Sequence, residues 1–256
     1  MQAAGGAFFA AVVALLAYRT YALTAAGAGA AFVVGATVFG SGGWTAAAVL
    51  FAFFLPSTLL SRIAGNQKRA LDNEQRQAPR SAWQVLANGG VAAVCALAAP
   101  RAGPAFAVAF AGAFAAASAD TWGTEVGMLS RRAPVSILTL RPVRAGVSGG
   151  VTPLGLAASV SGALCVALVS AAAGVGPFRA VAFGGVAGAI LDSILGASLQ
   201  AMRWCPVCQS ECETRRHHCG SSTTLRRGAS FLENDGVNFA ATLCGAIVAA
   251  MLARIE

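Results

Sequence analysis

Carboxylates occur in this sequence beside or within apolar stretches, where a charge is expensive. Asp120 and Glu125 directly follow the run AFAVAFAGAFAAAS. Asp192 lies inside GGVAGAILDSILGAS, and Asp235 lies where the last apolar stretch begins. A lone charge at bilayer depth costs about 2.5 to 3.5 kcal/mol, so each carboxylate needs a partner that compensates it. Because Mg²⁺ binds one or two carboxylates together with substrate phosphates, we predict that these four acids form a catalytic centre in which Asp120, Glu125 and Asp192 hold Mg²⁺.

Amide side chains occupy similar positions. Gln84 and Asn88 are one helical turn apart in QVLANGG, and Asn238 follows Asp235 in NDGVNF. We predict that these amides bind the substrate. Alternatives remain open, because Gln84 and Asn88 can instead form interhelical hydrogen bonds, and Asp235 can cap a helix.

Basic and glycine-rich segments beside the acids are suited to phosphate. The planar fork of Arg binds phosphate oxygens, and a glycine-rich turn before a helix lets backbone N–H groups approach an anion. The loop after Glu125 contains several arginines and then GVSGGVTPLG, which is not a Walker A motif. We predict that phosphate is bound by the following basic and turn residues: Lys68, Arg141, Arg144, Ser148, Gly149 and Gly150.

Membrane helices must position these residues, as the composition indicates. Of 256 residues, 57% are hydrophobic and 11% are charged, and the mean hydropathy is +0.67. Apolar windows of about 17 residues or more can cross a bilayer core about 30 Å thick. We predict an all-α polytopic bundle of about eight transmembrane helices that forms a single integral membrane domain, residues 1–256. The expected spans are 3–18, 22–40, 44–61, 82–100, 103–119, 150–173, 180–201 and 237–253.

The charge distribution predicts the orientation. Fifteen of the 18 Lys and Arg residues fall on one side of these spans, mainly in loops 62–80, 120–148 and 203–236. The positive-inside rule places these loops in the cytoplasm and both termini outside. The net charge of +8 does not indicate nucleic acid, because the cations lie beside membrane spans, where anionic lipid or a phosphorylated substrate is the expected partner. We expect an integral protein of a prokaryotic plasma membrane or of an organelle membrane.

Four of the seven cysteines lie in one of these loops, in CPVCQSECETRRHHCG. A C-x-x-C pair followed by His and Cys is typical of structural zinc sites, and a reducing compartment disfavours a disulfide. We predict that Cys205, Cys208, Cys219 and either His217 or His218 bind Zn²⁺ in the 203–236 loop. Cys212 is an alternative ligand, and a thiol cluster without metal is the alternative interpretation.

Five motifs in order carry a resemblance to a family. ADTWGTEVGMLSRR, GVSGGVTPLG, QVLANGG, LDSILGASLQ and NDGVNF together resemble an uncharacterised-domain family of integral membrane proteins that includes the phytyl-phosphate kinase of plants. The resemblance implies transfer of a phosphoryl group from a nucleoside triphosphate to a prenyl monophosphate. A more distant similarity to dolichol kinases and phosphatidate cytidylyltransferases implies CTP as a candidate donor. The segment RPVRAGVSGG lacks the Lys-rich stretch of the cytidylyltransferases, which leaves the nucleotide base open.

Together these features predict a membrane lipid kinase that acts on a polyprenyl or isoprenoid monophosphate such as phytyl phosphate. Its partners would be a lipid phosphate, a nucleoside triphosphate and the membrane, but no nucleic acid. The oligomeric state, a homodimer included, is left open. The alternatives are a cytidylyltransferase acting on a lipid phosphate and an ion-coupled transporter that uses the intramembrane carboxylates.

Overall fold

Helices make up most of the structure, a computed structural model that describes the backbone of residues 2–70 and 79–255 and the side chains of 5–64 and 79–255. The helices in this part are α1 (Gln2–Arg19), α2 (Ala25–Ala70), α3 (Ala82–Ala102), α4 (Pro104–Gly127), α5 (Pro153–Ala172), α6 (Phe178–Ser198) and α7 (Asn234–Leu252). The strands are β1 (Val135–Ser136), β2 (Gly150–Val151), β3 (Met202–Cys205), β4 (Ser210–Cys212) and β5 (Thr224–Arg227).

Local sequence signals explain where several helices begin. Ser81 caps α3 in a capping box: its hydroxyl accepts a hydrogen bond from the Gln84 N–H at 3.3 Å, and its own N–H donates to Gln84 Oε1 at 2.9 Å. Thr152 caps α5 by accepting from the Gly155 N–H at 3.0 Å, and Pro153 follows at the first helical position. The structure thus begins α3 and α5 beside residues that we expect in the site.

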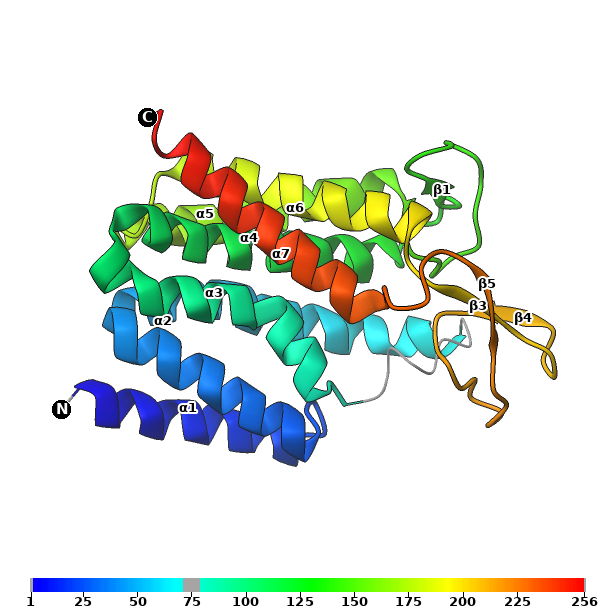
Figure 1. The fold of residues 1–256 in the computed structure, drawn as a ribbon, viewed down its shortest axis with the longest axis horizontal. Coiled ribbons are helices and arrows are strands. Elements are labelled where there is room, and N and C mark those ends of the chain that lie inside the picture. The colour runs from blue at the N-terminus through cyan, green and yellow to red at the C-terminus, as the bar shows by residue number, and fades with distance from the viewer. Residues whose placement is uncertain (1, 71–78, 256) are drawn as a thin grey trace.

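Helix α2 folds back on itself at Gly43, as Figure 1 shows. A straight α2 would carry Arg62 about 55 Å away from its start, yet Arg62 donates to Thr20 Oγ1 at 3.3 Å. Gly43 makes the reversal with φ 59° and ψ −147°, a backbone conformation that residues with a Cβ rarely adopt. The predicted spans 22–40 and 44–61 therefore belong to one element whose two arms turn at a single residue.

The expected count of eight transmembrane helices is not confirmed. Six helices in the described part, α2 to α7, are long and apolar enough to cross a membrane. The apolar part of α1, Gly5–Arg19, is shorter. The expected spans 22–40 and 44–61 are the two arms of α2, which are separated at Gly43, a residue whose backbone is not helical. Helix α4 continues to Gly127 instead of ending at 119, so Asp120 and Glu125 lie on its last turns.

Helix α4 forms the centre of the bundle. Its residues from Val108 to Ala119 are buried throughout, and Phe110 and Phe114 are among the largest fully buried side chains. Small residues let α6 and α7 approach it closely. A Cβ added at Gly188 of α6 would collide with Ala116 of α4 and lie 2.7 Å from the carbonyl oxygen of Ala241 of α7. The three helices are therefore in backbone contact at this level.

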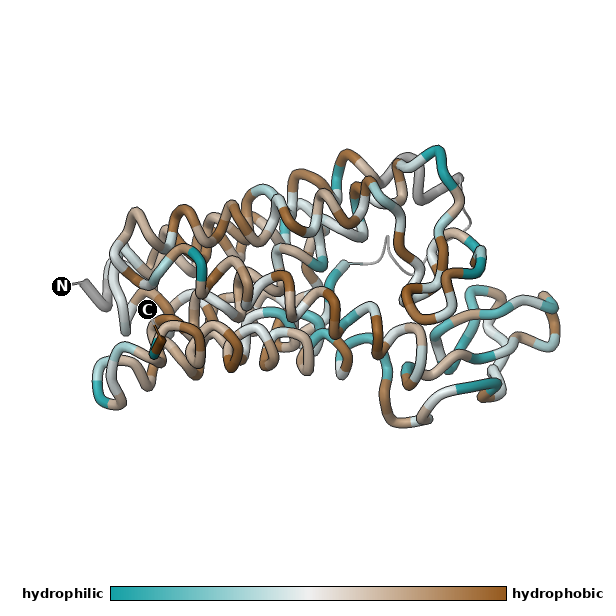
Figure 2. Tube along the Cα trace, turned by 90° about the horizontal axis from the view of Figure 1, so that it is seen from above, coloured by the Kyte–Doolittle hydropathy of each residue, from teal (hydrophilic) through white to brown (hydrophobic). Residues whose placement is uncertain are grey.

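The polar connections gather at one end of the bundle. The α4–α5 loop, the β4–β3–β5 antiparallel sheet and the start of α3 all lie there, whereas both chain ends lie at the opposite end (Figure 1). Figure 2 shows that the helices are mainly apolar along their length and that the segment carrying β3 to β5 is largely hydrophilic. We call this the loop end, and we call residues 202–227, which contain β3, β4 and β5, the strand module.

Candidate functional site

A cavity of about 1430 Å³ opens at the loop end between helices α2, α3, α4, α6 and α7, the α4–α5 loop and the strand module. Most of the residues predicted to act in catalysis or substrate binding line it. They are Gln84, Asn88, Asp120, Glu125, Arg144, Ser148, Gly149, Gly150, Asp192, Asp235 and Asn238. His217 and His218 of the predicted metal site also reach its wall. The structure therefore brings together side chains from segments far apart in the sequence.

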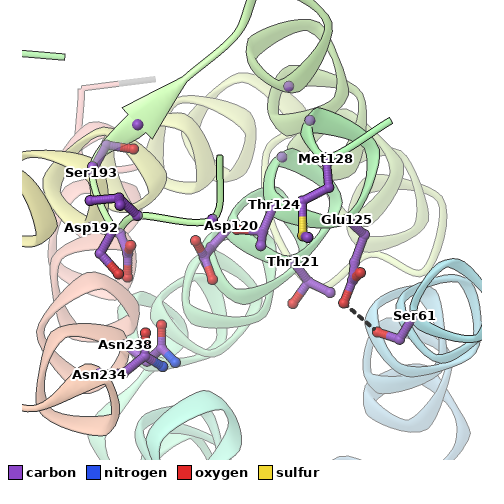
Figure 3. Close-up of a pocket in the computed structure, with 18 of the residues that line it drawn as sticks. Ser61, Asp120, Thr121, Thr124, Glu125, Met128, Asp192, Ser193, Asn234 and Asn238 are labelled. Carbon is purple, nitrogen blue, oxygen red and sulfur yellow. Dashed lines mark hydrogen bonds between the residues drawn. The ribbon is translucent and has the colours of Figure 1, made fainter. Parts of the chain in front are cut away.

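Asp120 and Asp192 face a common space with Asn238, as Figure 3 shows. Asp120 extends from α4 and Asp192 from α6, while Asn238 extends from the first turns of α7. Asp235 lies in the first turn of α7, where the helix dipole favours an acid. The N-cap residue of α7 is Glu233, so Asp235 does not serve as the cap. Carboxylate and amide oxygens from three helices thus line the cavity, and such oxygens are the kind of donor that hard divalent cations prefer.

Glu125 is held at one side of the cavity by hydrogen bonds between helices. Ser61 of α2 donates to Glu125 Oε1 at 2.8 Å (Figure 3). Arg80 donates to the Ser61 hydroxyl at 3.2 Å. Only 6% of Glu125 is exposed, so these contacts fix a carboxylate that is shielded from water. Glu125 therefore ties α2 and the start of α3 to the end of α4.

Arg80 is a site residue that the sequence did not single out. Burial lowers the pKa of its guanidinium below the usual value, whereas the nearby carboxylates of Glu125 and Asp120 favour the charged form. Arg retains its charge in proteins because its unperturbed pKa is so high. The cavity thus holds a cation beside two of the predicted metal-binding acids. The only signal in the sequence was its place directly before the Ser81 cap.

The predicted amides make local hydrogen bonds. Asn88 Nδ2 donates to the carbonyl oxygen of Gln84 at 2.9 Å, and Gln84 Oε1 serves in the cap of α3. Both side chains nevertheless line the cavity. They also line a smaller apolar pocket of about 100 Å³, which continues among α1, α2 and α3 and shares Arg80 with the cavity. Arg80, Gln84 and Asn88 therefore mark the boundary between a polar and an apolar space.

The basic residues predicted for phosphate differ in position. Arg144 lines the cavity, as do Arg131 and Arg132. Arg141 is exposed and does not line it. Lys68 lies in the last turns of α2, and its side chain is outside the described residues.

The glycine-rich turn packs on the end of α6. Gly149 has φ +78°, and a Cβ there would collide with Ala197 of α6. The Ser148 N–H donates to Glu213 Oε1 at 3.1 Å, and the Gly150 N–H donates to the carbonyl oxygen of Val147 at 3.1 Å. These two N–H groups, which we expected to meet a phosphate, already have acceptors, and the acceptor of Ser148 is a carboxylate from the strand module.

A family model described as Integral membrane protein DUF92 matches residues 8–246 of the chain. The chain belongs to this family. It is 30% identical over 270 residues to Protein PGR of Arabidopsis thaliana, across 91% of this chain and 90% of that protein. It is 31% identical over 187 residues to an uncharacterized membrane protein of Synechocystis, across 70% of this chain and 72% of that one.

The chain is also 28% identical over 207 residues to an uncharacterized membrane protein of Methanocaldococcus jannaschii, across 80% of this chain and 74% of the relative. No solved structure matches the chain. The expected membership of an uncharacterised-domain family of membrane proteins is thus confirmed, and the matched range includes all five motifs that carried the resemblance. None of these names states a reaction.

In this DUF92 protein the strand module contains a group of side chains that could hold a metal ion. The ligand atoms of Cys205, Cys208, His217 and Cys219 all lie within 4.8 Å of one another. The Sγ atoms of Cys205 and Cys219 are 3.6 Å apart, close to the ~3.8 Å that a tetrahedral Zn²⁺ with Zn–S bonds of about 2.3 Å imposes. The group includes His217 and neither His218 nor Cys212.

Proposed function

We propose that this DUF92 protein is a membrane lipid kinase that transfers a phosphoryl group from a nucleoside triphosphate, with CTP as a candidate, to an isoprenoid monophosphate. The observation that carries the proposal is the cavity at the loop end, which is lined by the acids Asp120, Asp192 and Asp235 and by the cations Arg80 and Arg144. Acids that hold Mg²⁺ and cations that neutralise phosphate are what phosphoryl transfer requires, because its barrier is lowered mainly by positioning and electrostatics.

Each residue would have a definite role. Asp120 and Asp192 would hold Mg²⁺, and Glu125 would add a negative charge at one side of the cavity. The ion would neutralise the charge of the phosphate oxygens. Arg144 would bind a phosphate of the donor. The bond between the terminal phosphorus and the bridging oxygen of the nucleotide breaks, and an oxygen of the lipid phosphate forms the new bond to that phosphorus. The nucleoside diphosphate leaves with the electron pair. The acceptor is already ionised, so no strong general base is needed.

The apolar pocket supports a lipid acceptor. It is lined by Phe9, Val13, Leu50 and Phe51, and it joins the polar cavity at Arg80, Gln84 and Asn88. An isoprenoid phosphate bound across this boundary would place its charged group beside Arg80 and the first part of its chain among apolar side chains. Such a division of polar and apolar contacts suits an amphipathic ligand.

The activity is tested by offering labelled CTP, ATP, GTP and UTP with phytyl, geranylgeranyl and undecaprenyl monophosphates to the purified protein. The proposal expects Mg²⁺-dependent conversion of one of these lipids to its diphosphate. A lipid product that carries CMP would identify a cytidylyltransferase instead. Cation-dependent uptake into proteoliposomes, without any lipid product, would identify a transporter.

Arg144 and Arg141 provide a matched pair of variants. Arg144→Ala should raise the KM for the nucleotide or the lipid phosphate by about tenfold, about 1.4 kcal/mol, because it removes a charged phosphate ligand from the cavity wall. Arg141→Ala should leave KM unchanged, because Arg141, which is exposed like Arg144, does not line the cavity. Initial rates at varied substrate concentrations measure both effects. Equal responses would remove Arg144 from the phosphate site.

The proposal also places the loop end in the cytoplasm, where a water-soluble nucleotide is available. Epitopes inserted after Arg132 should bind antibody only in permeabilised cells, because Arg132 lies in the α4–α5 loop. Epitopes inserted after Gly174, in the exposed α5–α6 connection, should bind antibody on intact cells. The reverse pattern would place the cavity on the wrong side for nucleotide.

The same proposal assigns Zn²⁺ to Cys205, Cys208, His217 and Cys219. Three thiolates and one imidazole form a complete tetrahedral set that leaves no position for substrate, so the ion is structural. The Cys208 N–H donates to Cys205 Sγ at 3.4 Å, which stabilises the negative charge on a ligating sulfur. The 203–236 loop is thus a metal-stabilised extension of one membrane domain.

A further inference from the structure

We infer that the zinc ligands of the strand module hold the glycine-rich turn of the site in place, with Glu213 as the connecting residue. The inference deepens the proposed function, because it assigns a positioning role at the same cavity. Glu213 is four residues before His217 and directly follows the end of β4, and it was not among the residues that the sequence analysis selected.

Glu213 makes hydrogen bonds with both of its carboxylate oxygens. Oε1 accepts from the Ser148 N–H at 3.1 Å, and Oε2 accepts from Gln200 Nε2 at 3.0 Å. Gln200 Nε2 also donates to the Ser148 hydroxyl at 3.0 Å, so the three residues close a ring. Gln200 is only 2% exposed, whereas Ser148 and Glu213 are half-buried and line the cavity. Hydrogen bonds to a charged group in such a place are stronger than neutral ones.

The ring joins three separate segments. Ser148 belongs to the glycine-rich turn, Gln200 follows the end of α6, and Glu213 belongs to the strand module. Gly149 has a positive φ and fits closely against Ala197. The Ile137 N–H donates to the carbonyl oxygen of Gly149 at 3.0 Å, and Gly150 pairs with Ser136 of β1. Beyond this pairing with β1 and the packing on α6, Glu213 of the strand module holds the turn by accepting from the Ser148 N–H.

Glu213 can act in this way only if the strand module is itself rigid. Strands β3, β4 and β5 have four, three and four residues, and sheets this small are marginal in water. The metal ligands lie on either side of Glu213: Cys205 and Cys208 precede it, and His217 and Cys219 follow it. A metal bound by all four closes the segment 205–219 into a loop, and the binding free energy becomes folding free energy for the module.

The module also contacts the helices that carry the acids. Arg227 of β5 donates to the carbonyl oxygen of Ala197 at 2.6 Å, near the end of α6. Arg215 donates to Glu233 Oε1 at 2.6 Å, and Glu233 is the N-cap residue of α7. Loss of the metal should therefore loosen the turn and both helix ends beside Asp192 and Asp235.

The test measures metal content and amide hydrogen exchange of residues 146–151 in the full-length purified protein. The wild type should contain about one Zn²⁺ per chain. Cys205→Ser/Cys208→Ser should lose the metal, and exchange in 146–151 should become about tenfold faster or more as the turn opens. Glu213→Ala should keep the metal and show the same faster exchange. Cys212→Ser, in the same loop but outside the ligand group, should change neither quantity.

Three outcomes would overturn the inference: a metal-free wild type, a zinc-free variant with unchanged exchange in 146–151, or unchanged exchange in Glu213→Ala. Should the double serine variant fail to fold, chelation of zinc from the wild type provides the same comparison. Because neither measurement needs turnover, the result is separate from that of the kinase assay. A protein without lipid kinase activity can still show the coupling, and an active kinase can lack it.

Discussion

Asp120→Asn should lower metal-dependent phosphoryl transfer by roughly a hundredfold or more, about 2.7 kcal/mol in activation free energy. The substitution keeps the size and most of the hydrogen bonding of the side chain, but it removes the negative charge that faces Asp192 across the cavity. A cation held by both carboxylates would then be bound by only one of the two negative charges. Single-turnover rates at several Mg²⁺ concentrations, expressed per folded molecule, measure the effect, and higher Mg²⁺ should restore part of the rate.

Glu211→Gln is the matched control, because it removes the same charge from the rim of the cavity. Glu211 is exposed and pairs with Arg226 at 3.3 Å, away from the acids of the helices. Exposed ion pairs of this kind contribute about 1 kcal/mol or less, so its turnover should stay near that of the wild type. Normal turnover per folded molecule in Asp120→Asn, with poor folding as the only defect, would show that Asp120 is structural.

Arg80→Gln should impair both stability and lipid-phosphate binding. Removal of a cation beside Glu125 and Asp120 leaves two carboxylates that repel each other in a partly enclosed space, and uncompensated buried charges cost about 3 to 5 kcal/mol. We expect a lower melting temperature and a KM for the lipid phosphate that is about tenfold higher or more. Thermal unfolding in detergent and lipid titration of the kinase rate measure the two effects.

Two further variants separate the charge of Arg80 from its shape. Arg80→Lys keeps the charge without the planar fork and should recover most of the stability but only part of the affinity. Arg62→Gln also changes an arginine on the cavity wall, but Arg62 is exposed and donates to Thr20, so it should have little effect. If Arg62→Gln and Arg80→Gln behave alike, Arg80 has no special place in the site.

Helix positions were the part of the fold that the sequence could predict best. The expected spans 82–100 and 180–201 correspond to Ala82–Ala102 and Phe178–Ser198, because long apolar stretches in a membrane have few alternatives to a helix. The reversal of α2 could not be predicted in form. The sequence predicted a break between residues 40 and 44, but it did not indicate that a single glycine with a positive φ, Gly43, would turn the chain there.

The acids and amides that line the cavity could be predicted, because a charge or amide within or beside an apolar helix is conspicuous in the sequence. Contacts between distant segments gave no such signal. Ser61 and Glu125 are 64 residues apart, and Ser148 and Glu213 are 65 apart, and nothing in their local sequence indicates the partner. Arg80 was one of fifteen Lys and Arg residues on the same side of the predicted spans. Glu213 lies in a loop for which the sequence indicated only the cysteine and histidine ligands.

The backbone contact between α4, α6 and α7 sets the spacing of the acids above it. Ala116 is one helical turn before Asp120, and Gly188 is one turn before Asp192, so the contact between Ala116 and Gly188 lies directly beneath the two carboxylates. No flexible side chain lies between the helices at that level to absorb a change in separation. If the two carboxylates bind a metal ion as we propose, a separation fixed in this way would favour a small ion with strict octahedral geometry over a larger one that tolerates irregular coordination.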